Sequence, residues 1–353
     1  MLYFNSKSPL LHPITVLGSE NREVTNLKVR DITGERLAFI KGSMPLTPHY
    51  YSILTNSILY TLDGFVQNSD GTFLRDTYWT DIMLLEHGLL KHRRSLFYKK
   101  LKGNYFSLLL FYSWGYYHWF CDVLPRYVMF METYGHAIRS LNILIQKNPP
   151  SWMKNSLELL NYNVHYVEFD GVYPVKIEIL HFIPPLSMTG DHDPKWLNKV
   201  RQGLLKNISV QHDKQSLKRL YISRSKAPSR KLKNEAALCE LLKKFGFEMI
   251  HAEDISYLEQ IKLFSNAEWL VAPHGAGLTN MLYMPKGAQV LELFSKNTLR
   301  RCYFTMAQTL GIQYHSLFLM PSDELKTGTD LIVEDIQLKA LFEFLKHKIK
   351  TSI

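Results

Sequence analysis

Short apolar runs separated by turn residues fill the first third of the chain, and this pattern predicts a β-rich segment over residues 1–100. Two of the turns carry an Asp-Gly pair, which favours a tight hairpin between apolar runs. The strand-like runs cover 14–18, 26–31 and 36–42, and the hairpin region 58–74 holds the pairs Asp63-Gly64 and Asp70-Gly71.

From residue 104 the pattern changes, and strand-like runs alternate with runs of helical spacing. The segment 113–135 has helical spacing, and Pro125 predicts a kink or a new helix start within it. Such alternation is typical of βαβ units in an α/β fold. The predicted strands cover 141–146, 163–169 and 176–182, and the predicted helices cover 151–160 and 194–205.

A polar stretch without periodicity, residues 206–218, is the predicted domain boundary, so the predicted domains cover 1–205 and 206–353. Strands and helices alternate again beyond it, and Ser256 with Glu259 predicts a capping box that opens a helix. The predicted strands cover 219–225, 247–250, 269–272 and 290–294, and the other predicted helices cover 234–245 and 333–348. We expect the last, amphipathic helix to pack back across the first domain.

Composition narrows the class of partner. An excess of 42 Lys and Arg over 32 Asp and Glu favours an anionic partner, such as a phosphorylated ligand or an anionic lipid surface. The basic residues are scattered and do not form a run with interleaved aromatics, so nucleic acid is not the expected partner. Three cysteines without metal-ligand spacing suit free thiols. With no leader and no long apolar span, the expected location is the cytoplasm, with peripheral membrane contact as an alternative.

The strand at 269–272 is followed by a loop that is a candidate cradle for an anion or nucleotide. Ligands of open α/β sheets bind where a strand gives way to a helix, and the first helical N–H groups point at them. Glycines allow the backbone to approach a ligand closely. The candidate residues are His274, Gly275, Ala276, Gly277, Leu278 and Thr279.

His118, Asp122 and Arg126 recur every four residues, which places His118 and Asp122 on one face of a helix. Charged groups in an apolar, aromatic stretch are costly to bury unless they are paired or used. One interpretation pairs Asp122 with Arg126 in a buried network. The other makes Asp122 or His118 the base that deprotonates an acceptor hydroxyl.

Arg224 lies at the end of the strand at 219–225, Arg230 follows six residues later, and a carboxylate lies near the end of the strand at 290–294. Arg224 and Arg230 suit a diphosphate because guanidinium groups bind phosphate through paired hydrogen bonds. Their alternative is solvated surface charge. Glu292 is a candidate acceptor for a ribose hydroxyl, with a helix cap as its alternative.

Metal binding has little support in the sequence. The pairs Glu168/Asp170 and Asp191/Asp193 could each hold a divalent cation, but neither lies in the half that carries the glycine loop. We therefore expect no metal.

Three segments in this order resemble the glycosyltransferase 61 family: YYHWFCDVLPRY, YISRSKAPSRKLKNE and the segment from Glu253 to Phe294 with its HGAGLTN motif. The resemblance covers about residues 100–300. It implies a GT-B-like α/β fold, with two Rossmann-like domains facing across a cleft and a β-rich N-terminal extension. The Rossmann-like parts would then be 101–205 and 206–353.

The resemblance also implies inverting, metal-independent transfer of a sugar from a nucleotide-sugar donor, with uridine diphosphate as the expected nucleotide, to a hydroxyl of a saccharide acceptor. His118, Asp122 and Arg126 resemble the His-x-x-x-Asp helix of the family on the acceptor side, and Asp122 is the expected base. Arg224, Arg230 and the loop His274–Thr279 resemble its donor site. The implied setting is bacterial synthesis of surface or capsular polysaccharide. A lipid-linked saccharide is one alternative for the acceptor.

Two other functions fit the same pattern. A pyruvyltransferase-like enzyme would use the His-Gly loop for phosphoenolpyruvate, and a non-catalytic protein would bind nucleotide-sugars without turnover. Comparing the binding of nucleoside diphosphates with that of phosphoenolpyruvate distinguishes a glycosyltransferase from the pyruvyltransferase-like enzyme. A search for donor hydrolysis or transfer distinguishes it from the non-catalytic protein.

Overall fold

A computed structural model describes residues 31–33, 49–77, 98–208, 217–295, 300–326 and 328–349. The chain divides into two compact units, here called the N-terminal unit (Met1–Asn21 and Pro45–Val200) and the C-terminal unit (Arg22–Met44 and Arg201–Ile353). The predicted strands at 14–18 and 36–42, and the one at 26–31 apart from Asp31, lie outside the described residues.

The N-terminal unit is built on a six-stranded mixed sheet in the order β2-β1-β6-β3-β4-β5. Its strands are β1 (Ser52–Tyr60), β2 (Phe65–Gln67), β3 (Lys99–Ser107), β4 (Leu141–Gln146), β5 (His165–Phe169) and β6 (Val175–Phe182). β1 and β2 form an antiparallel hairpin around Asp63-Gly64, which confirms the predicted turn. β1 also pairs antiparallel with β6, whereas β3 to β6 are parallel to one another.

The predicted helical segment after β3 consists of three consecutive pieces without an intervening loop. A five-residue π-helical turn, Trp119–Val123 (η2), joins the short helix α3 to α4. Pro125 lies in the first turn of α4, directly after the π-helical turn, so the predicted start of a new helix at this proline is confirmed. The helices of this unit are η1 (Arg75–Thr77), α3 (Tyr116–His118), η2, α4 (Leu124–Thr133), η3 (Gly135–Ala137), α5 (Ser151–Leu160) and α6 (Pro194–Lys206), whose last six residues belong to the C-terminal unit.

The C-terminal unit holds a second six-stranded sheet in the order β12-β11-β10-β9-β7-β8, parallel except for β12. Its strands are β7 (Lys218–Ile222), β8 (Phe247–Ile250), β9 (Ala267–Pro273), β10 (Gln289–Ser295), β11 (Gln313–Pro321) and β12 (Leu331–Ile332). The helices are α7 (Glu235–Lys244), η4 (Ala252–Asp254), α8 (Tyr257–Ser265), the 3-10 helix η5 (Ala276–Tyr283), α9 (Cys302–Leu310) and α10 (Asp335–Lys348). The capping box of Ser256 and Glu259 is present at the start of α8, as predicted.

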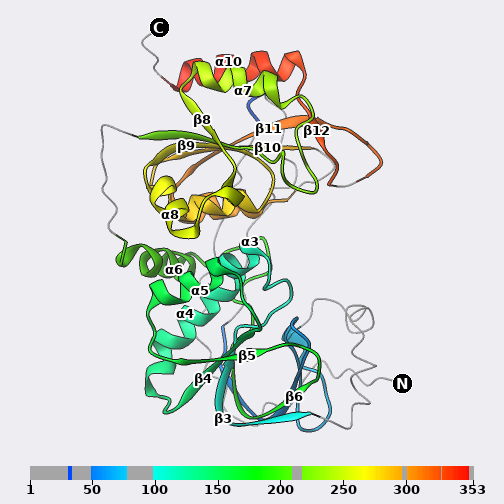
Figure 1. Ribbon diagram of the computed structural model, residues 1–353, viewed down its shortest axis with the longest axis vertical. Helices are drawn as coiled ribbons and strands as arrows, with labels where there is room; N and C mark the ends of the chain where they lie inside the picture. The colour runs from blue at the N-terminus through cyan, green and yellow to red at the C-terminus, as the bar shows by residue number, and fades with distance from the viewer. Residues whose placement is uncertain are drawn as a thin grey trace. The chain divides into compact units, whose positions relative to one another are not determined.

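Figure 1 shows α7 and α10 together on one face of this sheet and α8 on the other. Leu341 and Leu345 of α10 are fully buried in one core with Leu238 and Leu242 of α7. The apolar stripe of this last helix thus covers the sheet of its own unit, and its packing across the first domain stays a prediction. Among the described residues, every helix is too short or too polar to cross a bilayer.

Strand order places one ligand crevice in each unit. In chain order, the strands β7 to β11 lie 2-1-3-4-5, and β3 to β6 lie 3-2-1-4. In such doubly wound sheets the chain reverses its winding direction beside the first strand, and ligands bind there at the carboxyl ends of the strands. The expected crevices are therefore the loops after β7 and β9 and the loops after β3 and β6.

Candidate functional site

The loops after β7 and β9 bring the side chain of Arg224 onto the backbone of Gly275. A Cβ atom built on Gly275 would lie only 2.0 Å from Nη1 and 2.8 Å from Cζ of Arg224. No side chain fits in this space, so the guanidinium packs directly against the glycine. The loop itself continues the sheet, because His274 N donates to Leu293 O of β10 at 2.8 Å.

Arg224 lies in a positively charged environment. Its Nη2 donates to Ser229 O at 3.0 Å, and its Nε is buried without a hydrogen-bond partner. Burial, and then the nearby charge of Arg230, lower the pKa of Arg224. Arg230 itself holds a left-handed backbone conformation with φ 59°. Two close guanidiniums with donor capacity to spare form a site for an anion.

Glu235 anchors the loop that carries these arginines, and the sequence analysis missed it. Its carboxylate accepts from Tyr221 Oη at 2.6 Å and from Ser223 Oγ at 3.0 Å. Ser223 Oγ accepts in turn from Ser225 N at 3.1 Å. Burial and the Glu235 charge raise the pKa of Tyr221. Because Glu235 begins α7, the network ties both ends of the loop between β7 and α7 to one carboxylate.

Glu292 is fully buried on β10 and orients His274. The carboxylate accepts from His274 Nδ1 at one oxygen and from Tyr314 Oη, at 2.7 Å, at the other. Burial, followed by the Glu292 charge, raises the pKa of Tyr314. Both carboxylate oxygens of Glu292 are thus bonded inside the core, and the ribose contact stays a prediction. With Nδ1 bonded to Glu292, His274 keeps Nε2 for another partner.

The rest of the glycine loop contributes backbone and little side chain. Leu278 and Thr279 are buried, so their side chains belong to the core. Ala276 is exposed, and a Cβ on Gly277 would meet Ile222 side-chain carbons at 3.3 Å. Within the described part of the chain, the N–H groups of Ala276 and Gly277 donate no hydrogen bond, whereas Leu278 N donates to Gly275 O at 3.0 Å. Two free amides thus begin η5 beside Arg224 and His274.

In the N-terminal unit, His118 and Asp122 form the predicted pair. His118 Nδ1 donates to Asp122 Oδ2 at 2.7 Å, and Thr189 Oγ1, in the loop after β6, donates to the same oxygen at 3.0 Å. The side chain of Asp122 is 7% exposed and that of His118 is 24% exposed. His118 therefore offers Nε2 to solvent while Asp122 lies behind it. π-helical turns such as the one that carries Asp122 are frequent at functional sites.

Arg126 is a structural residue. Its guanidinium donates to Ser107 O, at the end of β3, at 2.5 Å and to Ile183 O, just beyond β6, at 3.1 Å. It lies 5.1 Å from the ring centre of Phe106. Burial lowers its pKa to about 10. The interpretation that pairs Arg126 with Asp122 is wrong, because the arginine instead ties the ends of two neighbouring strands together.

Three of the four carboxylates considered for metal binding serve local structure. Asp193 accepts from Trp196 N at 3.0 Å at the start of α6 and lies 3.3 Å from His49 Nε2. Glu168 and Asp170 accept from backbone N–H groups of neighbouring turns. Across the described ranges, no group of three or more His, Cys, Asp or Glu side chains is arranged to hold a metal ion.

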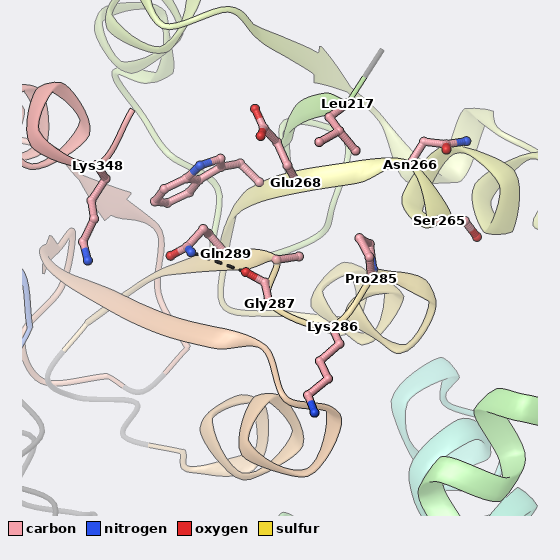
Figure 2. Close-up of a pocket in the computed structure, with 11 residues that line it drawn as sticks. Leu217, Ser265, Asn266, Glu268, Pro285, Lys286, Gly287, Gln289 and Lys348 are labelled. Carbon is pink, nitrogen blue, oxygen red and sulfur yellow. Dashed lines mark hydrogen bonds between the residues drawn. The ribbon is translucent and has the colours of Figure 1, made fainter. Parts of the chain in front are cut away.

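A pocket of about 730 Å³ lies at the amino ends of β9 and β10, the ends of the strands opposite the glycine loop. Its lining includes Glu268, Gln289 and Lys348, and Figure 2 shows Lys348 and Asn266 at opposite ends of the opening. Glu268 is already paired with Arg219 at 2.6 Å. Because ligands of this fold bind at the carboxyl ends of the strands, the pocket is separate from the site of Arg224 and His274.

A family model described as Glycosyltransferase 61 matches residues 116–291. EGF domain-specific O-linked N-acetylglucosamine transferase of Rattus norvegicus is 32% identical over 113 residues, which cover 31% of this chain and 21% of that protein. The protein of the same name from Drosophila melanogaster is 28% identical over 124 residues, which cover 33% of this chain and 24% of that protein. The chain thus spans about a fifth to a quarter of the length of these relatives. Since the family match takes in the His118 helix and the loops after β7 and β9, the chain belongs to the glycosyltransferase 61 family.

Proposed function

We propose that the protein is an inverting glycosyltransferase that moves a sugar from a nucleotide-sugar donor to a hydroxyl of a saccharide acceptor. The observation that carries the proposal is the packing of the Arg224 guanidinium against Gly275 at the β7/β9 switch point. Membership of the glycosyltransferase 61 family supports the same reaction class.

The C-terminal unit would hold the donor diphosphate. Arg224 and Arg230 supply positive charge, and the amides of Ala276 and Gly277 supply donors beside them. Charge builds on the diphosphate as the glycosidic bond breaks, and preorganised donors stabilise such charge in the transition state. These groups could perform this task without a metal, which is part of the proposal. His274, whose ring is fixed by Glu292, lies in the loop beside these amides.

The N-terminal unit would supply the base. His118 Nε2 takes the proton of the acceptor hydroxyl, the hydroxyl oxygen attacks the anomeric carbon, and the bond to the diphosphate oxygen breaks. The nucleoside diphosphate leaves with the bonding electrons, and a single displacement inverts the anomeric centre. Asp122, bonded to Nδ1, holds the imidazole in the tautomer that has Nε2 free and stabilises its positive charge. This assignment places His118 in contact with substrate and Asp122 behind it.

The GT-B arrangement, in which the two units face each other across a cleft, is part of this proposal, because the reaction needs base and donor on either side of one sugar. The named relatives are transferases that act on EGF domains. For this chain we propose a saccharide acceptor in surface polysaccharide synthesis, with uridine diphosphate as the donor nucleotide.

Transfer from a panel of uridine, guanosine and cytidine diphosphate sugars, followed by proton NMR of the anomeric signal of the product, tests the proposal. We expect product of inverted configuration from at least one donor, and its loss in His118→Ala. A product of retained configuration would refute the single displacement. Turnover of phosphoenolpyruvate with no turnover of any nucleotide-sugar would favour the pyruvyltransferase alternative.

A further inference from the structure

Two large aromatic side chains lie exposed beside His118. In Tyr112 and Trp114, 38% and 58% of the residue surface is exposed, whereas Phe106, Trp119, Phe120 and Tyr127 of the same unit are buried. The ring centres of Tyr112 and His118 are 5.4 Å apart, and those of Tyr112 and Trp114 are 5.8 Å apart at 78°. The pair therefore forms a corner of two nearly perpendicular rings next to the imidazole.

The loop that presents these rings is held in one shape. Tyr112 has φ 61°, a left-handed conformation that is unfavourable for a bulky side chain. Ser113 N donates to Leu110 O, and Gly115 N donates to Tyr112 O, both at 2.8 Å. A Cβ on Gly115 would lie 3.3 Å from Tyr112 O and 3.4 Å from His118 Cδ2. Strain of this kind is typical of functional sites, where the surrounding structure enforces it.

The loop after β6 reaches the same histidine and aspartate through Thr189. Met188 is 75% exposed, and its neighbour Thr189 donates to Asp122 Oδ2 at 3.0 Å. A turn closed by Asp191 N donating to Met188 O, at 2.9 Å, holds this segment. The loops after β3 and β6 meet at the switch point of the N-terminal sheet, where a ligand is expected. The aromatic corner thus belongs to that crevice.

We propose that Tyr112 and Trp114 form an acceptor subsite that stacks on the C–H face of a pyranose ring and brings one of its hydroxyls to His118 Nε2. This inference rests on the proposed function and names the acceptor as a six-membered sugar ring. A corner of two small aromatic faces beside an imidazole and a threonine hydroxyl fits a rigid ring with an apolar face and a polar rim. A lipid chain would instead need a continuous aliphatic surface.

Saturation-transfer NMR with methyl pyranosides of glucose, galactose, mannose, xylose and N-acetylglucosamine tests the subsite on the full chain without a donor. We expect transfer to the ring C–H protons of at least one glycoside. Trp114→Ala should weaken the binding of that glycoside about tenfold, because both the stacked indole face and the apolar area that it buries are lost. Trp114→Phe should keep most of the affinity. Tyr173→Ala is the matched control, since Tyr173 is also an exposed aromatic, at 62%, in the turn between β5 and β6.

Three results would overturn the subsite: no glycoside binds the wild type, Trp114→Ala binds as well as the wild type, or Tyr173→Ala loses as much affinity as Trp114→Ala. Binding of hexyl phosphocholine through its alkyl protons, with no glycoside bound, would also overturn it in favour of a lipid site. Nucleoside diphosphate binding is measured on the same samples, so that failure of the subsite is distinguished from failure of the proposed function. If nucleotide binds and no glycoside does, only the subsite fails.

Discussion

Replacing Gly275 with alanine adds one methyl group where the loop after β9 meets the Arg224 guanidinium. A Cβ atom there would lie 2.0 Å from Nη1 and 2.8 Å from Cζ of Arg224. The backbone of Gly275 is extended, with φ 165° and ψ 172°, a conformation that alanine also adopts. The methyl group therefore displaces the arginine and leaves the backbone unstrained.

The displacement sets the size of the effect. To reach the 3.4 Å of an ordinary contact from 2.0 Å, the guanidinium must move by about 1.4 Å. That shift breaks the 3.0 Å bond from Arg224 to Ser229 O and misaligns any hydrogen bond to a phosphate. Hydrogen bonds to charged groups contribute about 1.5–3 kcal/mol, and about 1.4 kcal/mol corresponds to a tenfold change in Kd. We expect nucleoside diphosphate affinity to fall about 10- to 100-fold.

Isothermal titration calorimetry with uridine and guanosine diphosphates measures this change. Arg224→Ala and the double variant Gly275→Ala/Arg224→Ala are the controls, because the added methyl group should act only through Arg224. Gly275→Ala should cause no further loss of affinity in the Arg224→Ala background, and unfolding curves should show that every variant is folded at the titration temperature. Wild-type affinity in Gly275→Ala would refute the reasoning, and so would a further loss of the same size in the double variant.

Three further predictions concern the base, the buried carboxylate and pH. Asp122→Asn should lower kcat by about 10²- to 10⁴-fold, since it removes the charge behind His118, and should leave nucleotide affinity unchanged. Initial rates at saturating donor measure kcat, and an unaltered kcat would contradict the assigned role of Asp122. Glu292→Gln should lower the free energy of unfolding by about 1–3 kcal/mol in urea titrations, because His274 and Tyr314 donate to different oxygens and an amide keeps only one of them. Wild-type stability would argue against the buried network. Burial lowers the pKa of His181 from 6.5 to about 4, so between these pH values the unfolded chain binds more protons than the folded one, and stability falls as the pH drops from 6.5 to 4. In His181→Gln the urea midpoint should fall less steeply over this pH range than in the wild type. Identical pH profiles would exclude His181 as the cause.

The sequence predicted most elements because their hydrophobic periods are regular. The helix at 151–160 and the strand at 247–250 match α5 and β8 at both ends, and the glycine loop follows β9 as expected. The i, i+4 spacing of His118 and Asp122 also predicted their contact, which persists although a π-helical turn begins between them.

The contact between Arg224 and Gly275 depends on strand order, which periodicity does not specify. The two residues meet because β9 pairs with β7 on the side opposite β8. The environment of Glu292 was equally hidden, since a central parallel strand is buried on both faces and gives no alternating pattern to place a polar residue. The aromatic corner at Tyr112 and Trp114 comes from a loop conformation with a left-handed tyrosine, for which the residue types gave no signal.

The most direct test of the central claim is calorimetry of the wild type, Arg224→Ala and Arg230→Ala with uridine diphosphate, guanosine diphosphate and phosphoenolpyruvate. The account predicts that the wild type binds a nucleoside diphosphate and not phosphoenolpyruvate, and that each arginine variant loses at least tenfold in affinity. Binding of phosphoenolpyruvate alone, or nucleotide binding that is unchanged in both variants, would contradict it.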